Sequence, residues 1–346
     1  MNKKINFGIV GIGHIGKRHL SCINENELCQ LIAICDKTPL NEISGLSHDL
    51  YEKMFYNSID ELLCNESIDV ISICTPNFLH ASMALKCLKN DKHVIIEKPM
   101  TLNTKDAEAI MQISKKVGKH VFCVMQNRFS PTILWLKKLI ENNILGKINF
   151  VQVNCFWNRN SSYYKLSDWH GRIALDGGPL YTQFSHFIDI IYWLFGDFSN
   201  IESSFFKFNK NTILESEDSG LVRFNLKKNI FGTLMYSTSI FRKNFESSII
   251  ISGDQGTVKI GGQYMDKLEY CDINNYETPN FDLDLQCNDY GSYKGSAANH
   301  SKIYDSIVQV LTSNKEFFIG VEEGRSVVNI IEKIYKQRKI NNNECA

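Results

Sequence analysis

The chain has 346 residues, in which 38 Lys and Arg residues balance 38 Asp and Glu residues. This length exceeds the usual size of one domain, so we expect two. A formal net charge of zero provides no basic surface for nucleic acid or an anionic membrane, which favours a small-molecule partner.

The cysteine pattern indicates a reducing environment. Eleven cysteines are present without a C-x-x-C pair, and several lie inside apolar runs where a thiol packs as a small hydrophobe. No apolar run has the length of a spanning helix or the pattern of a signal peptide. We therefore expect a cytoplasmic protein without a metal.

Strand and helix patterns alternate through the first third of the chain. Repeated βα units with short connections predict a doubly wound parallel sheet, and we assign residues 1–125 to one α/β domain of the Rossmann type. The expected strands are 5–10, 31–35, 70–74, 93–97 and 121–125, and the expected helices begin near Ile15 and cover 59–63, 79–89 and 104–117.

The pattern changes after Arg128, and residues 126–346 predict a second, α+β domain. Successive strands without intervening helices indicate a large, mainly antiparallel open sheet. The polar segment 272–300 is expected to be an irregular loop. The expected strands are 148–156, 201–208, 221–226, 230–237 and 248–252, and the expected helices are 131–142, 181–194, 298–311 and 322–337.

The first strand leads into a dinucleotide-binding pattern, G-x-G-x-x-G, formed by Gly11, Gly13 and Gly16. Helix N-H groups at His14 and Ile15 are expected to face the phosphates. Asp36 ends the second strand about 20 residues further on, where a carboxylate accepts from ribose hydroxyls and repels a 2′-phosphate. NAD is therefore preferred to NADP, which stays a minor alternative because two cations, Arg18 and Lys37, lie nearby in the sequence.

The segment 92–100, KHVIIEKPM, delivers Glu97, Lys98 and Pro99 to the C-terminal end of a buried strand. Ligands of open α/β sheets bind at this edge. A solvated loop lysine is the alternative interpretation of Lys98. The fourth strand ends similarly in Thr75-Pro76-Asn77, and Asn77 is also a good helix N-cap.

The order GIGHIG, Asp36, CTPNFLHA and EKP resembles the glucose-fructose oxidoreductase and inositol dehydrogenase family, Gfo/Idh/MocA. The resemblance implies that Lys98 is the family's catalytic lysine and that segment 126–128 approaches the nicotinamide. The cofactor-binding residues expected on this basis are Gly11, Gly13, His14, Ile15, Gly16, Asp36, Thr75, Asn77, His80, Glu97, Lys98 and Gln126.

The segment 176–198, DGGPLYTQFSHFIDIIYWLFGDF, resembles the family's second signature, in which a glycine-rich turn precedes a helix with a histidine. His186 maps onto that histidine, and a core histidine is the alternative interpretation. Thr182 stands where many polyol-oxidising members have an aspartate. Since threonine cannot act as that base, proton transfer is assigned to His186 together with Lys98.

Thr182-Gln183, Trp169 and Arg172 resemble the branch that oxidises C3 of UDP-N-acetylglucosaminuronate. This implies a nucleotide-sugar substrate and a role in polysaccharide biosynthesis. The aromatic Trp169 can instead belong to the core. The expected substrate-binding residues are Lys98, Arg128, Trp169, Arg172, Thr182, Gln183 and His186.

Three other functions stay open at this point. The chain can be an inositol or free-sugar dehydrogenase, an NAD-dependent glycosidase of the same family, or a non-catalytic dinucleotide sensor. A sensor has no need of both Lys98 and His186, which argues against it. We further expect a homodimer or homotetramer formed through the open face of the C-terminal sheet.

Overall fold

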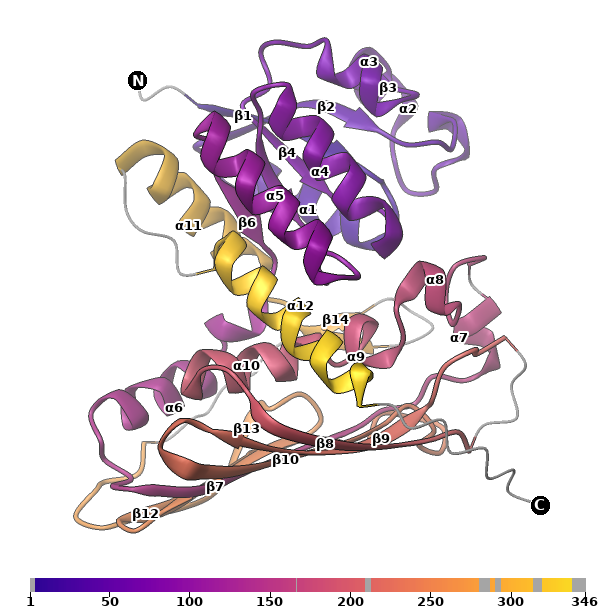
Figure 1. Cartoon of the computed structure of the whole chain (residues 1–346). Helices are drawn as coiled ribbons and strands as arrows, with labels where there is room; N and C mark the ends of the chain where they lie inside the picture. The colour runs from indigo at the N-terminus through magenta and orange to yellow at the C-terminus, as the bar shows by residue number, and fades with distance from the viewer. Residues whose placement is uncertain are drawn as a thin grey trace. The chain divides into compact units, whose positions relative to one another are not determined.

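The computed structural model describes residues 4–165, 167–208, 213–279, 287–289, 294–313 and 319–337. The chain forms two compact units, labelled by element in Figure 1. Unit 1 comprises Met1–Gln126 and Asn299–Val328, and unit 2 comprises Asn127–Ala298 and Asn329–Ala346. The first boundary lies within one residue of the predicted one, but residues 299–328 belong to unit 1.

Unit 1 is built on a six-stranded sheet in which every neighbouring pair is parallel. The strand order is β3 (Phe55–Tyr56), β2 (Cys29–Cys35), β1 (Ile5–Val10), β4 (Val70–Ile73), β5 (His93–Ile96) and β6 (Val121–Cys123). The chain runs outward from β1 in one direction and from β4 in the other, so right-handed crossovers place helices on both faces. The predicted doubly wound parallel sheet is confirmed.

Four helices of unit 1, α1 (His14–Glu25), α3 (Ile59–Leu63), α4 (His80–Lys89) and α5 (Thr104–Val117), lie where the periodicity places them, whereas the short α2 (His48–Tyr51) was not predicted. Asn103 caps the longest of the crossover helices by accepting from the Asp106 N-H at 2.8 Å, and Gly118 ends it in a left-handed conformation. The other elements are α11 (His300–Ser313) and the short 3-10 turns η1 (Leu40–Glu42), η2 (Glu52–Met54), η3 (Asn77–Leu79) and η4 (Gln126–Phe129).

The described residues of segment 299–328 pack into unit 1 through apolar contacts, hydrogen bonds and ion pairs. The Tyr304 ring lies 5.5 Å from that of Phe7, and the Cys123 N-H donates to the Ile319 carbonyl at 3.1 Å. Gly324, in α12 (Val321–Lys336), lies so close to Cys123 that an added Cβ would be 2.4 Å from its Sγ. Helix α12 starts in unit 1 and ends in unit 2.

Unit 2 contains a seven-stranded sheet that is antiparallel except for one pair, β7 with β10. The predicted mainly antiparallel sheet is therefore confirmed, although two of its strands, β12 and β13, were not foreseen. The order is β13 (Lys267–Ile273), β12 (Gly256–Gly261), β11 (Glu246–Gly253), β7 (Ile148–Phe156), β10 (Ile230–Ser237), β9 (Ser219–Leu226) and β8 (Ser199–Phe206).

The helix predicted over 181–194 is two helices. In α9 (Pro179–Thr182) the Pro179 carbonyl accepts from Gln183 and from Phe184, which closes the turn, and α10 (Ser185–Phe195) then begins afresh. Thr182 and His186 therefore do not lie on one continuous helix. The other helices of this unit are α6 (Pro131–Glu141), α7 (Ser161–Lys165) and α8 (Ile173–Asp176), with the 3-10 turn η5 (Lys227–Asn229).

The loop predicted over 272–300 is partly ordered into strands. β13 extends to Ile273, and β14 (Cys287–Asp289) pairs antiparallel with β15 (Lys294–Ala297). The irregular-loop prediction is wrong for these residues, because a polar sequence satisfies its backbone groups by pairing as readily as by hydration. Residues 280–286 and 290–293 lie outside the described part of the chain.

The two faces of the large sheet differ in burial. Along β7 and β10, Val151, Val153 and Leu234 are buried beneath the helices, whereas alternate side chains point the other way. That outer face carries Phe150, Leu221, Phe231 and Met235, which are 38 to 50% exposed. Within the described ranges, each helix falls short of the length or the apolar character that crossing a bilayer requires.

Candidate functional site

The switch point of the unit 1 sheet lies between β1 and β4, where the strand order reverses. A doubly wound sheet binds dinucleotides in the crevice at this point. The segment after β1 carries the glycine pattern, and the segment after β4 carries Thr75 and Asn77. The fold therefore brings two predicted cofactor segments to one edge of unit 1.

Each motif glycine has a separate steric reason. Gly11 has φ +90°, and a Cβ there would be 2.7 Å from the Cys74 carbonyl oxygen. At Gly16 a Cβ would be 1.9 Å from the Gly11 oxygen, so this glycine allows the helix to pack on the strand. A Cβ on Gly13 would meet no described atom within 4 Å. Open space above Gly13, at the N-terminus of α1, fits the approach of a pyrophosphate.

Asp36 organises the same crevice. Its Oδ2 accepts from the Ile12 N-H at 2.6 Å, and its Oδ1 accepts from the Thr38 N-H at 2.9 Å. The carboxylate is thereby held at the end of β2 beside the glycine loop. Since a carboxylate offers about four acceptor positions, these two bonds leave capacity for ribose hydroxyls.

His80 links the loops that follow β4 and β5. Its Nδ1 lies 2.7 Å from the Pro99 carbonyl oxygen, and its Nε2 lies 2.8 Å from that of Thr75. Burial lowers the pKa of His80, and a neutral ring can donate to only one of these two carbonyls. Because both ring nitrogens lie against backbone carbonyls, His80 holds the two loops together. Asn77 is buried at the start of η3.

Lys98 follows β5 at the predicted edge and is partly buried. Its backbone N-H donates to Oε2 of Glu97 at 3.1 Å. Glu97 is itself buried, and its other oxygen lies against two imidazoles, those of His19 and His300. The sequence motif singled out Glu97, whose predicted contact with the cofactor stays a prediction, and neither histidine was predicted.

In unit 2, His186 is 1% exposed on α10, one turn after Thr182 ends α9. The Thr182 hydroxyl donates to the Asp176 carbonyl at 2.9 Å. Threonine is therefore engaged in holding the glycine turn. His186 supplies the imidazole of this signature.

Asp176 anchors the turn before α9. Its carboxylate accepts from the Gly171 N-H at 2.5 Å and from the Gly178 N-H at 2.8 Å. Burial raises the pKa of Asp176 to about 6, although these two bonds oppose the shift. The turn that presents Thr182 is thus held by one buried carboxyl group.

An aromatic cluster surrounds Gln183. Its Nε2 donates to the Tyr163 hydroxyl at 2.8 Å, and the Tyr163 ring stacks on His170 with centroids 4.6 Å apart. Trp169 is tilted against the same histidine at 4.1 Å, and the Arg159 guanidinium lies 5.2 Å from the Tyr163 ring. Tyr163 and Arg159 were missed, since neither lies in a recognisable motif.

The remaining predicted residues lie in different surroundings. Arg172 is exposed at the start of α8, so it is accessible to solvent. Gln126 is buried in η4, and its carbonyl accepts from Asn299 Nδ2 at 3.4 Å. Arg128 is 0% exposed and pairs with Asp189, which makes its described role structural. Its predicted contact with a substrate stays a prediction.

Family profiles match nearly the whole chain. The profile of the oxidoreductase family's NAD-binding Rossmann fold matches residues 5–125, and that of its C-terminal alpha/beta domain matches residues 137–342. The first profile lies within unit 1, and the second covers most of unit 2 together with segment 299–328 of unit 1. The predicted NAD-binding domain is therefore confirmed.

Two solved structures share the fold throughout. WlbA dehydrogenase from Bordetella pertussis, in complex with NADH and UDP-GlcNAcA, has a TM-score of 0.85 and 27% identity, covering 97% of this chain and 96% of that one. WlbA from Chromobacterium violaceum, with the same two ligands, has a TM-score of 0.86 and 25% identity, covering 97% and 94%.

One curated relative is 2,7-anhydro-N-acetylneuraminate hydratase of Escherichia coli (strain K12), 27% identical over 195 residues. That match covers 56% of this chain and 50% of the relative, so the chain spans about half the length of this curated protein. The two family profiles, by contrast, cover both units. The chain belongs to the Gfo/Idh/MocA oxidoreductase family, with an NAD-binding Rossmann domain as the main part of unit 1.

Proposed function

We propose that the protein is an NAD-dependent dehydrogenase that oxidises a secondary alcohol carbon of a nucleotide sugar, with C3 of UDP-N-acetylglucosaminuronate as the first candidate. The observation that carries the proposal is similarity over the full length to WlbA structures that hold NADH and UDP-GlcNAcA. The sequence Thr182-Gln183, in place of the aspartate of polyol-oxidising members, supports the same choice.

The proposed cofactor contacts follow from unit 1. Gly13 leaves room for a pyrophosphate, and the Asp36 carboxylate has acceptor capacity for the adenosine ribose. When bound, NAD supplies the acceptor for a hydride leaving the sugar carbon. Lys98, beyond the end of β5, is assigned to the sugar hydroxyl, where an ammonium group stabilises negative charge that develops on oxygen.

Proton removal is assigned to His186. Oxidation of an alcohol requires the hydroxyl proton to leave as the hydride leaves, and a neutral imidazole accepts a proton near neutral pH. Thr182 is a poor alternative because its hydroxyl has no basic lone pair at this pH and already donates to the Asp176 carbonyl. Lys98 and His186 therefore have separate proposed tasks on one hydroxyl group.

Purified protein with NAD, followed at the absorbance of NADH, tests the substrate class. UDP-N-acetylglucosaminuronate, UDP-N-acetylglucosamine, free glucose and myo-inositol form the panel. The proposal expects NADH formation with the first compound at the highest kcat/KM. If NADH stays bound, an enzyme-stoichiometric single turnover gives the same ranking. Oxidation of inositol or glucose without any response to the UDP-sugars would overturn it.

Two variants test the assigned roles. His186→Asn should lower kcat by about 10²- to 10⁴-fold, the usual value of a general base. Lys98→Ala should lower kcat at least as much while NAD binding persists. The double variant should lose less kcat than the product of the two separate fold-losses, because both residues act on the same hydroxyl group. Fully multiplicative effects would contradict a shared step.

A further inference from the structure

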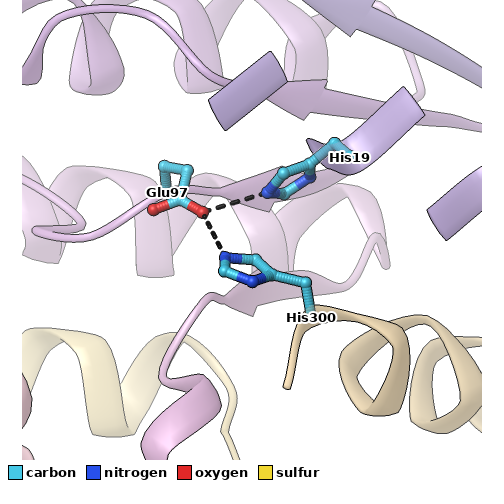
Figure 2. A group of neighbouring side chains, drawn as sticks. All are labelled: His19, Glu97 and His300. Carbon is cyan, nitrogen blue, oxygen red and sulfur yellow. Dashed lines mark hydrogen bonds and ion pairs between the residues drawn. The ribbon is translucent and has the colours of Figure 1, made fainter. Parts of the chain in front are cut away.

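A buried carboxylate in unit 1 lies between two histidines. Glu97 Oε1 is 3.0 Å from Nε2 of His19 and 3.4 Å from Nε2 of His300. Figure 2 shows the two rings directed at the same carboxylate oxygen. The three residues come from α1, the end of β5 and the first position of α11, and each is at most 6% exposed.

The outer atoms of His19 and Glu97 are also engaged. Nδ1 of His19 lies 2.7 Å from the Ser72 hydroxyl and 2.9 Å from the Tyr304 hydroxyl. On the other side, Oε2 of Glu97 accepts the Lys98 backbone N-H at 3.1 Å. A single carboxylate therefore connects the histidine pair to the backbone of Lys98. The orientation of that carboxylate thus helps to fix the backbone position of Lys98 after β5.

The protonation states of Glu97, His19 and His300 set the charge of the cluster. Burial raises the pKa of Glu97, but hydrogen bonds from the two histidines outweigh it and hold the pKa well below its ordinary value. Burial lowers the pKa of His19, but interactions with Cys74 and Glu97 outweigh burial and raise the pKa to about 10. Burial also lowers the pKa of His300. The favoured state is an ion pair of Glu97 with His19, next to a neutral His300.

A metal ion is the competing occupant. One ligand atom from each of the three residues lies within 4.8 Å of the others, and imidazole with carboxylate suits a divalent metal. A metal requires His19 to give up its Nε2 proton, whereas the ion pair already balances the buried carboxylate. We therefore interpret the cluster as side chains in direct contact, without a metal between them. The test below includes a measurement that detects a bound metal.

The loop carrying Lys98 is held on its other side as well. His80 Nδ1 lies 2.7 Å from the Pro99 carbonyl oxygen, so residues 97 and 99 are both fixed by buried imidazoles. Beside His300, Asn299 begins the part of the chain that returns to unit 1 and donates to the Gln126 carbonyl at 3.4 Å. Gln126, where the chain leaves unit 1, and Asn299, where it returns, are thus hydrogen-bonded to each other next to this network.

We propose that His19 and His300 are positioning residues that act through Glu97 to set the placement of Lys98 during the reaction. This inference rests on the proposed function, in which Lys98 acts on the sugar hydroxyl. Neither histidine touches the substrate in this account. Their contribution is to keep the Glu97 carboxylate oriented, so that the bond from Oε2 to the Lys98 N-H persists.

His300 variants provide the test, because glutamine can place a polar N-H group near Glu97 Oε1, where His300 Nε2 lies 3.4 Å away, and leucine cannot. His300→Leu should lower kcat by about 10²-fold, the cost of a displacement near 1 Å at a reacting group. His300→Gln should stay within about threefold of the parent, and the KM for NAD should change little in both. Ile303→Ala is the matched control, because Ile303 is 1% exposed on the same helix and lies outside the network.

The control should lower the melting temperature without lowering kcat. If His300→Leu does not fold, Tyr304→Phe replaces it, since that change removes one of the two hydroxyls at Nδ1 of His19 and leaves the ring in place. For Tyr304→Phe we expect a several-fold loss of kcat with an unchanged KM for NAD. Metal analysis of the purified parent protein accompanies both, and no stoichiometric metal is expected.

Different results overturn different claims. Folded His300→Leu with the parent kcat, or equal losses in the Leu and Gln variants, refutes positioning through this bond. One metal per chain that disappears together with activity in the variants replaces the direct network by a metal site. If Lys98→Ala itself keeps the parent kcat, the proposed function fails, whatever the histidine variants show.

Discussion

Arg128 and Asp189 form an ion pair with two hydrogen bonds inside unit 2. The Arg128 Nε donates to Oδ2 at 2.9 Å, and Nη2 donates to Oδ1 at 2.6 Å. Both side chains are 0% exposed, and the guanidinium also lies 5.3 Å from the Trp193 ring centre. The pair fastens η4, where the chain enters unit 2, to α10, which carries His186.

Removing one partner should therefore destabilise the protein severely. We expect Asp189→Ala to lower the free energy of unfolding by about 3 to 5 kcal/mol, since it leaves a buried cation unpaired. The double change Arg128→Met with Asp189→Leu should recover most of this loss. Urea unfolding measures both effects. A single variant within about 1 kcal/mol of the parent would contradict the buried pair.

The same double variant separates the structural role of Arg128 from its predicted substrate contact. If the pair is only structural, the folded double variant keeps the parent KM for the sugar. A raised KM in a protein of parent stability would instead support a direct contact of Arg128 with the substrate.

Asp36 should control the choice of cofactor. Asp36→Ala removes the acceptor for the ribose hydroxyls and the charge that repels a 2′-phosphate, so NAD should bind more weakly and NADP relatively better. Titration calorimetry with both dinucleotides measures the ratio. Because Asp36 also holds the Ile12 and Thr38 N-H groups, Asp36→Asn is the control that keeps the shape but loses the charge. An unchanged NAD-to-NADP ratio in both variants argues against this role.

Local patterns predicted most of the fold because they report on backbone geometry that a few neighbours decide. The glycine run 11–16 and Pro131 at the first turn of α6 act within one turn of the chain. The parallel pairing of β7 with β10 is different, because no local pattern distinguishes it from an antiparallel pair. The return of residues 299–328 to unit 1 likewise depends on packing partners such as Phe7, far away in the sequence.

The site shows the same division between local and distant information. Motifs located Glu97 and His186, whose neighbours in sequence form recognisable signatures. His19 and His300 were not predicted, because a buried histidine shows its partner only after the chain has folded. The hydrogen bond from Thr182 to Asp176 was equally hidden, because it forms only in the folded turn.

The stability contributed by His19 should depend on pH in a defined window. Folding raises its pKa from 6.5 to about 10, so its contribution is complete below pH 6.5 and disappears as the pH rises through about 10. The melting temperature of the parent should exceed that of His19→Gln most at pH 6.5, and the difference should shrink towards pH 10. His48→Gln, at a side chain 50% exposed, is the control. A difference that is constant or grows over this range would contradict the ion pair.

The outer face of the unit 2 sheet should form a homo-oligomeric interface. Phe231 pairs in register with Phe150, and Met235 pairs with Leu221, so these exposed apolar side chains form one patch. Light scattering at micromolar concentration should give a dimer or tetramer, and the double change Leu221→Lys with Met235→Lys should dissociate it. Leu50→Lys, at a position 60% exposed in unit 1, should have no effect. A monomeric parent protein would contradict this prediction.

The proposed reaction transfers a hydride from C3 of a nucleotide sugar to NAD. Incubating the protein with NAD and UDP-N-acetylglucosaminuronate that carries deuterium at C3, followed by mass spectrometry of the cofactor, tests it directly. Deuterium should appear in the NADH, and the single turnover should be slower than with the unlabelled sugar. NADH that forms without deuterium, or a sugar that is left unchanged while another alcohol is oxidised, would contradict it.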